Sequence, residues 1–316
     1  NGSARVIGPN PAYPTHSSAE GAHAGSRHIT YTLNPKRNWL PDLLELRNKV
    51  KYNPNIAGIL IINPDNPTGM VYPERVLAEI VAIAKEFGLF IISDEIYARI
   101  TYGPEKMVPI AKVLGDVPGI TMRGLSKEIP WPGARCGWIE VYNKDKDPMF
   151  ARYVKTIVDA KMLEVCSTTL PQRVIPEIFS DPRYAKHLAE QSSEYEKRSE
   201  IAYSVLKKVP GILAPKPAGA FYMTVVFEDG VLSENQTLAI ANSRAKESIE
   251  KKMVNIPLDR RFAYYLMASR GICVVPLSGF NSGYQGFRIT LLESDKEKLK
   301  DRFETIAGAI KEYLLS

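Results

Sequence analysis

Short apolar runs separated by a helical segment constrain the fold of this chain more than any other feature. Residues 57–62 and 89–92 are of strand length and almost wholly apolar, which is typical of strands buried on both faces of a sheet. Between them, residues 73–87 carry apolar side chains at helical spacing. Ile120–Met122 and Gly137–Val141 are further strand candidates. This order predicts an α/β fold with a mostly parallel central sheet and flanking helices.

The second half of the chain has a different pattern. In the first half, a helix is expected over residues 40–49. From about Asp147 helical patterns dominate, and a long charged helix is expected over residues 184–208. Beyond it, strands are expected at 220–227, 272–275 and 286–292, and helices at 236–252, 260–270 and 295–315. Short strands that alternate with helices predict a smaller α+β C-terminal domain. We expect a large α/β domain over residues 1–195 and a small domain over 196–316.

Polar side chains follow three of the expected strands. Asn66 comes after the first buried strand, Asp94 after the next, and Lys127 after the third. In parallel sheets, ligands bind where the carboxyl ends of the strands meet. The sequence therefore predicts a site that gathers residues far apart along the chain.

Composition excludes several classes of function. The 316 residues are 45% hydrophobic and 24% charged, as in an ordinary globular protein. The net charge is +6, but basic and acidic residues are mixed throughout, so no nucleic-acid partner is expected. No apolar run reaches membrane length, since the longest is Ile56–Ile62. The three cysteines and four histidines have no metal-ligand spacing, which predicts no metal site and a reducing, cytoplasmic location.

Five segments in order resemble the signature stretches of one enzyme family, the pyridoxal-phosphate (PLP)-dependent aminotransferases of fold type I, class I/II. Asn66, Asp94, Lys127 and Arg135 are separated by 28, 33 and 8 residues, as in that family. The segments are PAYPTH (11–16), NPDNPTG (63–69), SDEIYARI (93–100), GLSKEIPWPGARCGW (124–138) and GFRIT (286–290). The resemblance implies the family's fold, its cofactor and the transfer of an amino group from an L-amino acid to a 2-oxo acid.

The resemblance assigns the cofactor ring to a small set of residues. Lys127 would bind PLP as a Schiff base, because a lysine amine held in a closed site can act as nucleophile and then as base. Asp94 would hold a proton on the pyridine nitrogen, supported by His16. Asn66 and Tyr97 would donate to the phenolic oxygen of the ring. These assignments make Lys127, Asp94 and Tyr97 the expected catalytic residues.

Further residues are assigned to the ring face, the phosphate and the substrate. Tyr13 stands where the family stacks an aromatic ring on the cofactor, and Arg135 matches the family's phosphate arginine. Ser126 is a second phosphate candidate, and Gly124 departs from the serine often found there. Arg288 matches the arginine that binds the substrate carboxylate with two hydrogen bonds. Asn66 is also expected to touch the substrate.

The resemblance leaves two questions open: which of several related functions the chain has, and what precedes its first residue in family members. Family members usually carry about a hundred further residues before this point, including a glycine-rich helix start and a tyrosine that reaches the partner subunit. A homodimer is expected from the family. The alternatives are a PLP-dependent carbon–sulfur lyase, an enzyme like aminocyclopropane-carboxylate synthase, and a non-catalytic PLP-binding sensor domain. The identity of the donor and acceptor is not readable from these motifs.

Overall fold

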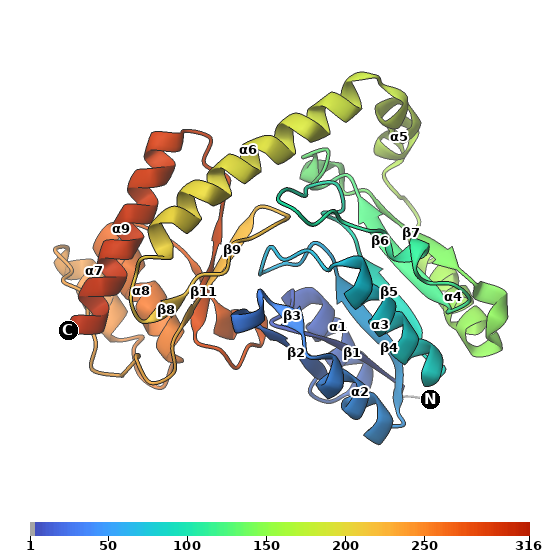
Figure 1. The fold of residues 1–316 in the computed structure, drawn as a ribbon, viewed down its shortest axis with the longest axis horizontal. Helices are drawn as coiled ribbons and strands as arrows, with labels where there is room; N and C mark the ends of the chain where they lie inside the picture. The colour runs from blue at the N-terminus through green and yellow to red at the C-terminus, as the bar shows by residue number, and fades with distance from the viewer. Residues whose placement is uncertain (1–3) are drawn as a thin grey trace.

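The computed structural model describes residues 4–316, whose strands form two separate sheets (Figure 1). The larger sheet has the strand order β3-β2-β1-β4-β5-β6-β7. Its strands are β1 (Arg5–Asn10), β2 (Thr30–Asn34), β3 (Leu40–Pro41), β4 (Ile56–Ile62), β5 (Phe90–Asp94), β6 (Gly119–Gly124) and β7 (Gly137–Tyr142). The strands β2, β1, β4, β5 and β6 pair in parallel, whereas β3 and β7 are antiparallel to their neighbours. The predicted mostly parallel α/β sheet is confirmed.

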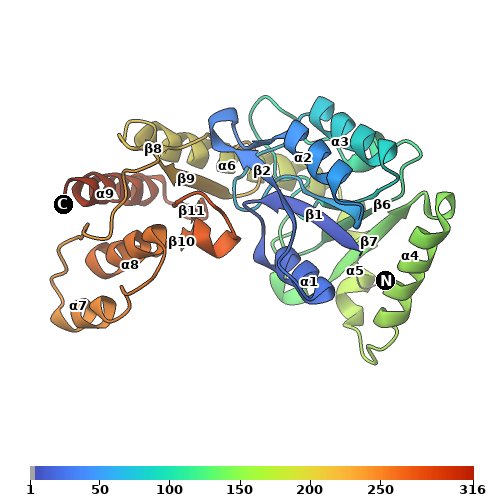
Figure 2. The same cartoon turned by 90° about the horizontal axis from the view of Figure 1, so that it is seen from below.

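Helices cover both faces of this sheet (Figure 2). On one face lie α2 (Leu43–Tyr52) and α3 (Glu74–Glu86), whose apolar side chains join those of β1, β2, β4 and β5 in a single buried core. On the other lie α1 (Pro14–Ala24) and α4 (Pro148–Lys161). Between α1 and α4 this second face carries a cavity of about 1080 Å³, lined by side chains of β1, β4, β5 and both helices. His16 lies at the edge of this cavity.

Local sequence accounts for the β4–α3–β5 unit at the centre of the sheet. Most of β4 is buried because it lies between β1 and β5 and packs against helices on one face. The apolar side of α3 packs on it through Val76, Leu77 and Ile80, which are buried. Gly88 follows α3 with a φ of 64°, a left-handed conformation that glycine adopts without strain. The chain then turns into β5, which carries Asp94 as its last residue.

The second sheet is antiparallel, with the strand order β10-β11-β9-β8. Its strands are β8 (Ile212–Leu213), β9 (Tyr222–Phe227), β10 (Val275–Pro276) and β11 (Gly286–Thr290). Against it pack α8 (Leu258–Arg270), α9 (Lys296–Leu315) and the second half of α6 (Arg183–Leu206), in a core that is separate from that of the large sheet. The remaining helices are α5 (Thr169–Ser180) and α7 (Ser243–Glu250). This agrees with the expected smaller α+β C-terminal part.

Several expected element bounds are wrong. The helix expected over residues 236–252 is present only as α7, because the Gln236 side chain bonds Ser233 N and Val231 O and holds a loop there. The helix expected over residues 40–49 begins at Leu43, since the Asp42 carboxylate caps it by accepting from Glu45 N at 2.9 Å. The strand expected over residues 272–275 is limited to Val275–Pro276.

The long helix expected over residues 184–208 is observed as α6, which runs from the large-sheet side to the small-sheet side (Figure 1). The domain boundary expected between residues 195 and 196 falls inside this helix and stays a prediction. Within residues 4–316, no helix is both long enough and apolar enough to cross a membrane.

Candidate active site

Lys127 lies in the loop that follows β6. This loop is closed by backbone hydrogen bonds from Leu125 N to Cys136 O at 3.1 Å and from Trp131 N to Leu125 O at 3.0 Å. The ammonium nitrogen of Lys127 lies 5.6 Å from the ring centroids of both Tyr97 and Phe221. No carboxylate in residues 4–316 comes within ion-pair distance of it. The amine is therefore held by two aromatic rings and remains available to react.

Asp94 and His16 form a pair at the end of β5. His16 Nε2 lies 2.7 Å from Asp94 Oδ2, and Asp94 Oδ1 accepts from Ile96 N at 3.1 Å. The Tyr13 ring meets the His16 ring edge-on, with centroids 5.8 Å apart. The start of α1 therefore supports this carboxylate from the side, as the sequence predicts for His16. Tyr13 is 40% exposed, so one face of its ring can receive a ligand.

Asn66 and Arg288 join the two sheets. Arg288, on β11, donates from Nη1 to Asn66 Oδ1 at 2.8 Å. Its guanidinium lies over the rings of Tyr222 and Phe280, at 4.3 and 4.9 Å from their centroids. Burial lowers the pKa of Arg288. No acidic residue among those described forms an ion pair with it. A half-buried arginine with only neutral partners is suited to binding an anion such as a substrate carboxylate.

Tyr97 lies in the same group through a partner that sequence reasoning missed. Its hydroxyl is 2.9 Å from that of Tyr222, and burial raises the pKa of Tyr97 above its ordinary value. The Phe221 ring packs edge-on against Tyr97. Phe221 and Tyr222 are adjacent at the start of β9. This strand pairs with β11, which carries Arg288. The signal that could have identified Tyr222 is the register between β9 and β11. Thr224 lies opposite Arg288, and Tyr222 stands two positions before Thr224.

The structure does not bring Arg135 and Ser126 into this group. Arg135 is exposed and folds back on its own turn, donating from Nη1 to Pro132 O at 2.9 Å. Ser126 is half-buried and its hydroxyl makes no hydrogen bond within residues 4–316. Their expected contacts with phosphate therefore stay predictions.

Gly124 departs from the serine often found at its position for a steric reason. A Cβ added to Gly124 would lie 2.9 Å from Cys136 O and 3.2 Å from Gly137 Cα. In this chain β6 and β7 approach too closely there for any side chain, because Gly124 pairs directly with Gly137. The departure reflects the packing of β7 on β6 and leaves the assignment of Lys127 intact.

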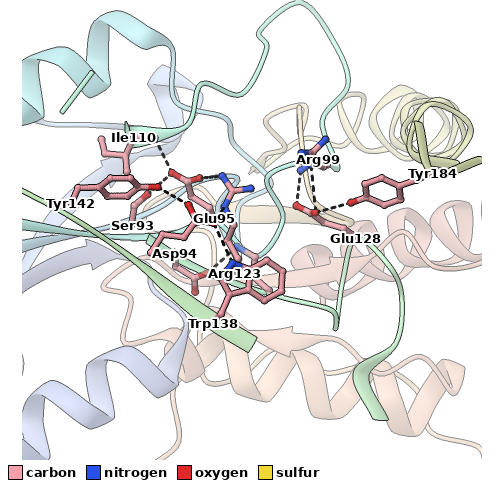
Figure 3. A network of polar contacts seen from close by, with 12 residues as sticks. Ser93, Asp94, Glu95, Arg99, Ile110, Arg123, Glu128, Trp138, Tyr142 and Tyr184 are labelled. Carbon is pink, nitrogen blue, oxygen red and sulfur yellow. Dashed lines mark hydrogen bonds and ion pairs between the residues drawn. The ribbon is translucent and has the colours of Figure 1, made fainter. Parts of the chain in front are cut away.

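A buried polar network fixes the turn behind Asp94 (Figure 3). Glu95 is 1% exposed and accepts from Arg123 Nη2 at 2.7 Å and from Ile110 N at 2.8 Å. Arg123 also lies 3.5 Å from Glu140 on β7. Burial raises the pKa of Glu95, opposed by the bond from Ile110 N and by Arg123. The network ties together the ends of β5, β6 and β7, and so holds Asp94 in place.

The side chains that the structure gathers fit the expected cofactor ring. Asp94 with His16 is the acceptor that a protonated pyridine nitrogen needs, and Lys127 is an amine without an ion-pair partner. Asn66 keeps its amide donors free, because only its oxygen is bonded by Arg288. This donor set suits the ring of PLP.

Comparison with known proteins places this site in a family. The sequence pattern of the family "Aminotransferase class I and II" matches residues 1–306. The chain is 53% identical over 310 residues to an uncharacterized aminotransferase, MJ1479, of Methanocaldococcus jannaschii, covering 98% of this chain and 72% of that protein. It is 32% identical over 224 residues to the glutamate-pyruvate aminotransferase AlaA of Escherichia coli K12, covering 71% of this chain and 54% of that protein.

Solved structures agree in fold. The alanine aminotransferase from Pyrococcus furiosus superposes with a TM-score of 0.79 and 28% identity, over 96% of this chain and 70% of that one. An aminotransferase from Escherichia coli superposes with a TM-score of 0.78 and 26% identity, over 99% and 71%. The present chain thus spans about half to three quarters of the length of these relatives. It belongs to the class I and II aminotransferases, a family whose members use pyridoxal phosphate.

Proposed function

We propose that this chain carries the catalytic residues of an aminotransferase that moves an amino group from an L-amino acid to a 2-oxo acid in a ping-pong reaction. One observation carries the proposal. The Lys127 amine is linked to the Arg288–Asn66 pair through the rings of Tyr97 and Tyr222. The Asp94–His16 pair adjoins the loop of Asn66, because Asp94 O accepts from Asn63 N at 2.9 Å. A carboxylate for the ring nitrogen, a reactive amine and an arginine for a carboxylate are the groups that amino transfer requires.

The residues have separate tasks in the proposed reaction. Bound pyridoxal phosphate supplies an electron-withdrawing ring that acidifies the α-carbon of an attached amino acid. Asp94, braced by His16, keeps the proton on the ring nitrogen. Lys127 holds the cofactor at rest, and its Nζ takes the proton from the substrate α-carbon once it is released. Arg288 fixes the substrate carboxylate and so orients the α-hydrogen toward Lys127.

The substrates we propose are L-alanine and L-glutamate as donors, with their 2-oxo acids as acceptors. Support comes from the relatives that carry such names, the glutamate-pyruvate aminotransferase of E. coli and the alanine aminotransferase of P. furiosus.

The test is the visible absorption spectrum of the PLP-loaded protein while L-alanine, L-glutamate and L-aspartate are added in turn. We expect L-alanine or L-glutamate to convert the cofactor to its amine form, and pyruvate or 2-oxoglutarate to reverse this. Release of ammonia or a thiol with no accumulation of the amine form would show a lyase. No spectral response to any of the three would contradict amino transfer.

We also propose that the chain acts as a homodimer. Support comes from a concentration of exposed apolar side chains around the α4–α5 connection. Met162, Leu163, Val165 and Leu170 are 68–94% exposed there. Light scattering of the purified protein should give twice the mass of one chain. Replacing Leu163 and Val165 by Glu should give a monomer, and an unchanged mass would place the dimer contact elsewhere.

A further inference from the structure

The long helix α6 contacts the segment that follows Lys127. Near its start, His187 Nε2 donates to the backbone oxygen of Glu128 at 3.1 Å. One turn earlier, the Tyr184 hydroxyl lies 3.5 Å from Glu128 Oε2. Farther along, Ser192 Oγ donates to Arg99 O at 3.3 Å. The first half of α6 therefore holds both Glu128, next to Lys127, and Arg99, two residues after Tyr97.

Glu128 is the centre of these contacts, and Figure 3 shows those with Arg99 and Tyr184. Its Oε1 accepts from Arg99 N at 3.0 Å, and its Oε2 lies 3.9 Å from Arg99 Nε. Arg99 and Glu128 together with Tyr184 and His187 are called the clasp below. The clasp joins the loop of Lys127, the turn of Tyr97 and the start of α6.

The burial of Glu128 shows how tightly this point is held. Glu128 is 7% exposed. Burial raises the pKa of its carboxyl, whereas the hydrogen bond from Arg99 N and the charges of Arg123 and Arg99 lower it. A buried carboxylate is costly unless it accepts hydrogen bonds, so the bond from Arg99 N is needed once Glu128 is in place.

The same helix reaches the other side of Lys127 and the arginine of the substrate site. Tyr195 packs on Phe221, with ring centroids 5.7 Å apart, and Phe221 is one of the two rings around the Lys127 ammonium. Arg198 Nη1 donates to Leu291 O at 3.2 Å, directly after β11 with Arg288. The helix α6 thus contacts the residue after Lys127, one of the two rings beside the Lys127 ammonium, and the residue that follows β11.

We infer that Glu128 is a positioning residue for Lys127, held by Tyr184 and His187 of α6, and that α6 couples its position to the strand of Arg288. The inference rests on the proposed function, since it needs Lys127 to be the cofactor lysine. Lys127 has no ion pair among the described residues, and its long side chain has several rotatable bonds. Its amine is placed by the backbone at residues 127–128 and by the two rings, and the clasp fixes that backbone.

The test uses two matched pairs of variants. Glu128→Leu removes the acceptor for Arg99 N, whereas Glu128→Gln keeps an oxygen there. His187→Leu removes the donor to Glu128 O, whereas His187→Gln restores an amide donor. The His187 side chain is exposed, so its replacement leaves no buried void and both His187 variants should fold.

Two quantities are measured for each variant, at a temperature well below its melting temperature. One is the rate at which acetic anhydride acylates Lys127 in the cofactor-free protein, followed by peptide mass spectrometry. The other is kcat and KM of the loaded enzyme for its amino donor. We expect Glu128→Leu to lower kcat about tenfold with little change in KM, and His187→Leu to lower it about threefold, because a displaced reacting group loses orientation. Both leucine variants should change the acylation rate, and both glutamine variants should stay near wild type.

A purely structural clasp gives a different result. The leucine variants would then melt at lower temperature, while the acylation rate and kcat stayed at wild-type values, and this would overturn the inference. Lys127→Ala, measured in parallel, separates this from failure of the proposed function. If Lys127→Ala still yields a borohydride-fixed cofactor adduct, the assignment of Lys127 itself is wrong. If it yields none and the leucine variants behave as wild type, only the clasp inference is wrong.

Discussion

Two aspartates near the ends of β4 and β5 have opposite surroundings. Asp94 is paired with His16 at 2.7 Å. Asp65 is fully buried without an ion pair among the described residues, and its carboxylate accepts only from the backbone and hydroxyl of Thr68, at 3.0 and 2.5 Å. Burial raises the pKa of Asp65 to about 7, and the nearby Asp94 adds to the shift. The environment of Asp65 therefore favours the protonated form of its carboxyl far more than water does.

Asp65 should make the stability of the protein depend on pH. A carboxyl whose pKa is raised on folding stabilises the native state at low pH, and this contribution is lost as the pH rises from about 4 through about 7. At about 1.4 kcal/mol for each pKa unit, the loss is at most about 4 kcal/mol. Asp65→Asn should remove it, since an amide keeps an oxygen for Thr68. Urea unfolding at pH 5 and pH 8 measures this, and a difference between the two proteins that does not change with pH would contradict it.

Arg288 should govern the affinity for the substrate carboxylate. Arg288→Gln should lower kcat/KM for the amino donor by about 100-fold, mainly through KM, since a charge-assisted pair worth about 3 kcal/mol is lost. Arg288→Lys should restore part of it, because an ammonium keeps the charge without the planar pair of donors. Arg183→Gln is the control, at an exposed side chain of the α6 start. Equal losses in the Arg288 and Arg183 variants would remove Arg288 from the substrate site.

At the residue scale, motif order located the side chains that lie together. Asn66, Lys127 and Arg288 were predicted, and the rings of Tyr97 and Tyr222 link them. Asp94 was predicted together with its partner His16. Arg135 was predicted equally well by its spacing, yet its side chain turns to Pro132 O. Spacing along the chain fixes the backbone position of a residue, whereas the orientation of an exposed arginine depends on the ligand or protein that meets it.

At the element scale, the segments with the clearest apolar patterns were the most predictable. β4 and α3 were placed within a residue or two, because a continuous apolar run and a clear helical side leave little choice. β1 was not predicted as a full strand, since only Val6 and Ile7 are apolar and its Gly-Pro-Asn end is typical of a turn. Its strand conformation comes from pairing with β2 and β4, which a local pattern does not contain.

The strand that carries Arg288 should depend on the glycine at its start. A Cβ on Gly286 would overlap Val225 O and lie 2.9 Å from Leu277 Cδ1. Gly286→Ala should therefore destabilise the protein by about 2 kcal/mol or more through overpacking and a displaced β11. Gly308→Ala is the matched control, because a Cβ there meets nothing within 4 Å and lies inside α9, where it should stabilise by up to about 1 kcal/mol. Urea unfolding of both variants measures the difference, and equal effects would contradict the packing seen at β11.

At the scale of the whole molecule, the site depends on how the two sheets meet. Asn66 follows a strand of the large sheet and Arg288 lies on the small sheet, so their hydrogen bond exists only when both parts are packed together. The sequence predicted both parts, but no local pattern predicts their contact. The aromatic side chains of Phe221, Tyr222 and Phe280 form that contact and were recognised only in the structure.

Cofactor binding should stabilise the whole protein. A ligand at 100 times its dissociation constant stabilises the native state by about 2.7 kcal/mol. We therefore expect the melting temperature to rise on addition of PLP and to rise less for Asp94→Ala, which loses the partner of the ring nitrogen. An equal rise for both proteins, measured by differential scanning calorimetry, would exclude Asp94 from the cofactor site.

The central claim is that Lys127 is the residue that holds the cofactor. The most direct measurement is to load the protein with PLP, reduce it with borohydride, digest it and locate the cofactor by peptide mass spectrometry. The account predicts one modified peptide, with the label on Lys127, and no specific label in Lys127→Ala. A stoichiometric label on any other lysine, or a label that survives in Lys127→Ala, would contradict it.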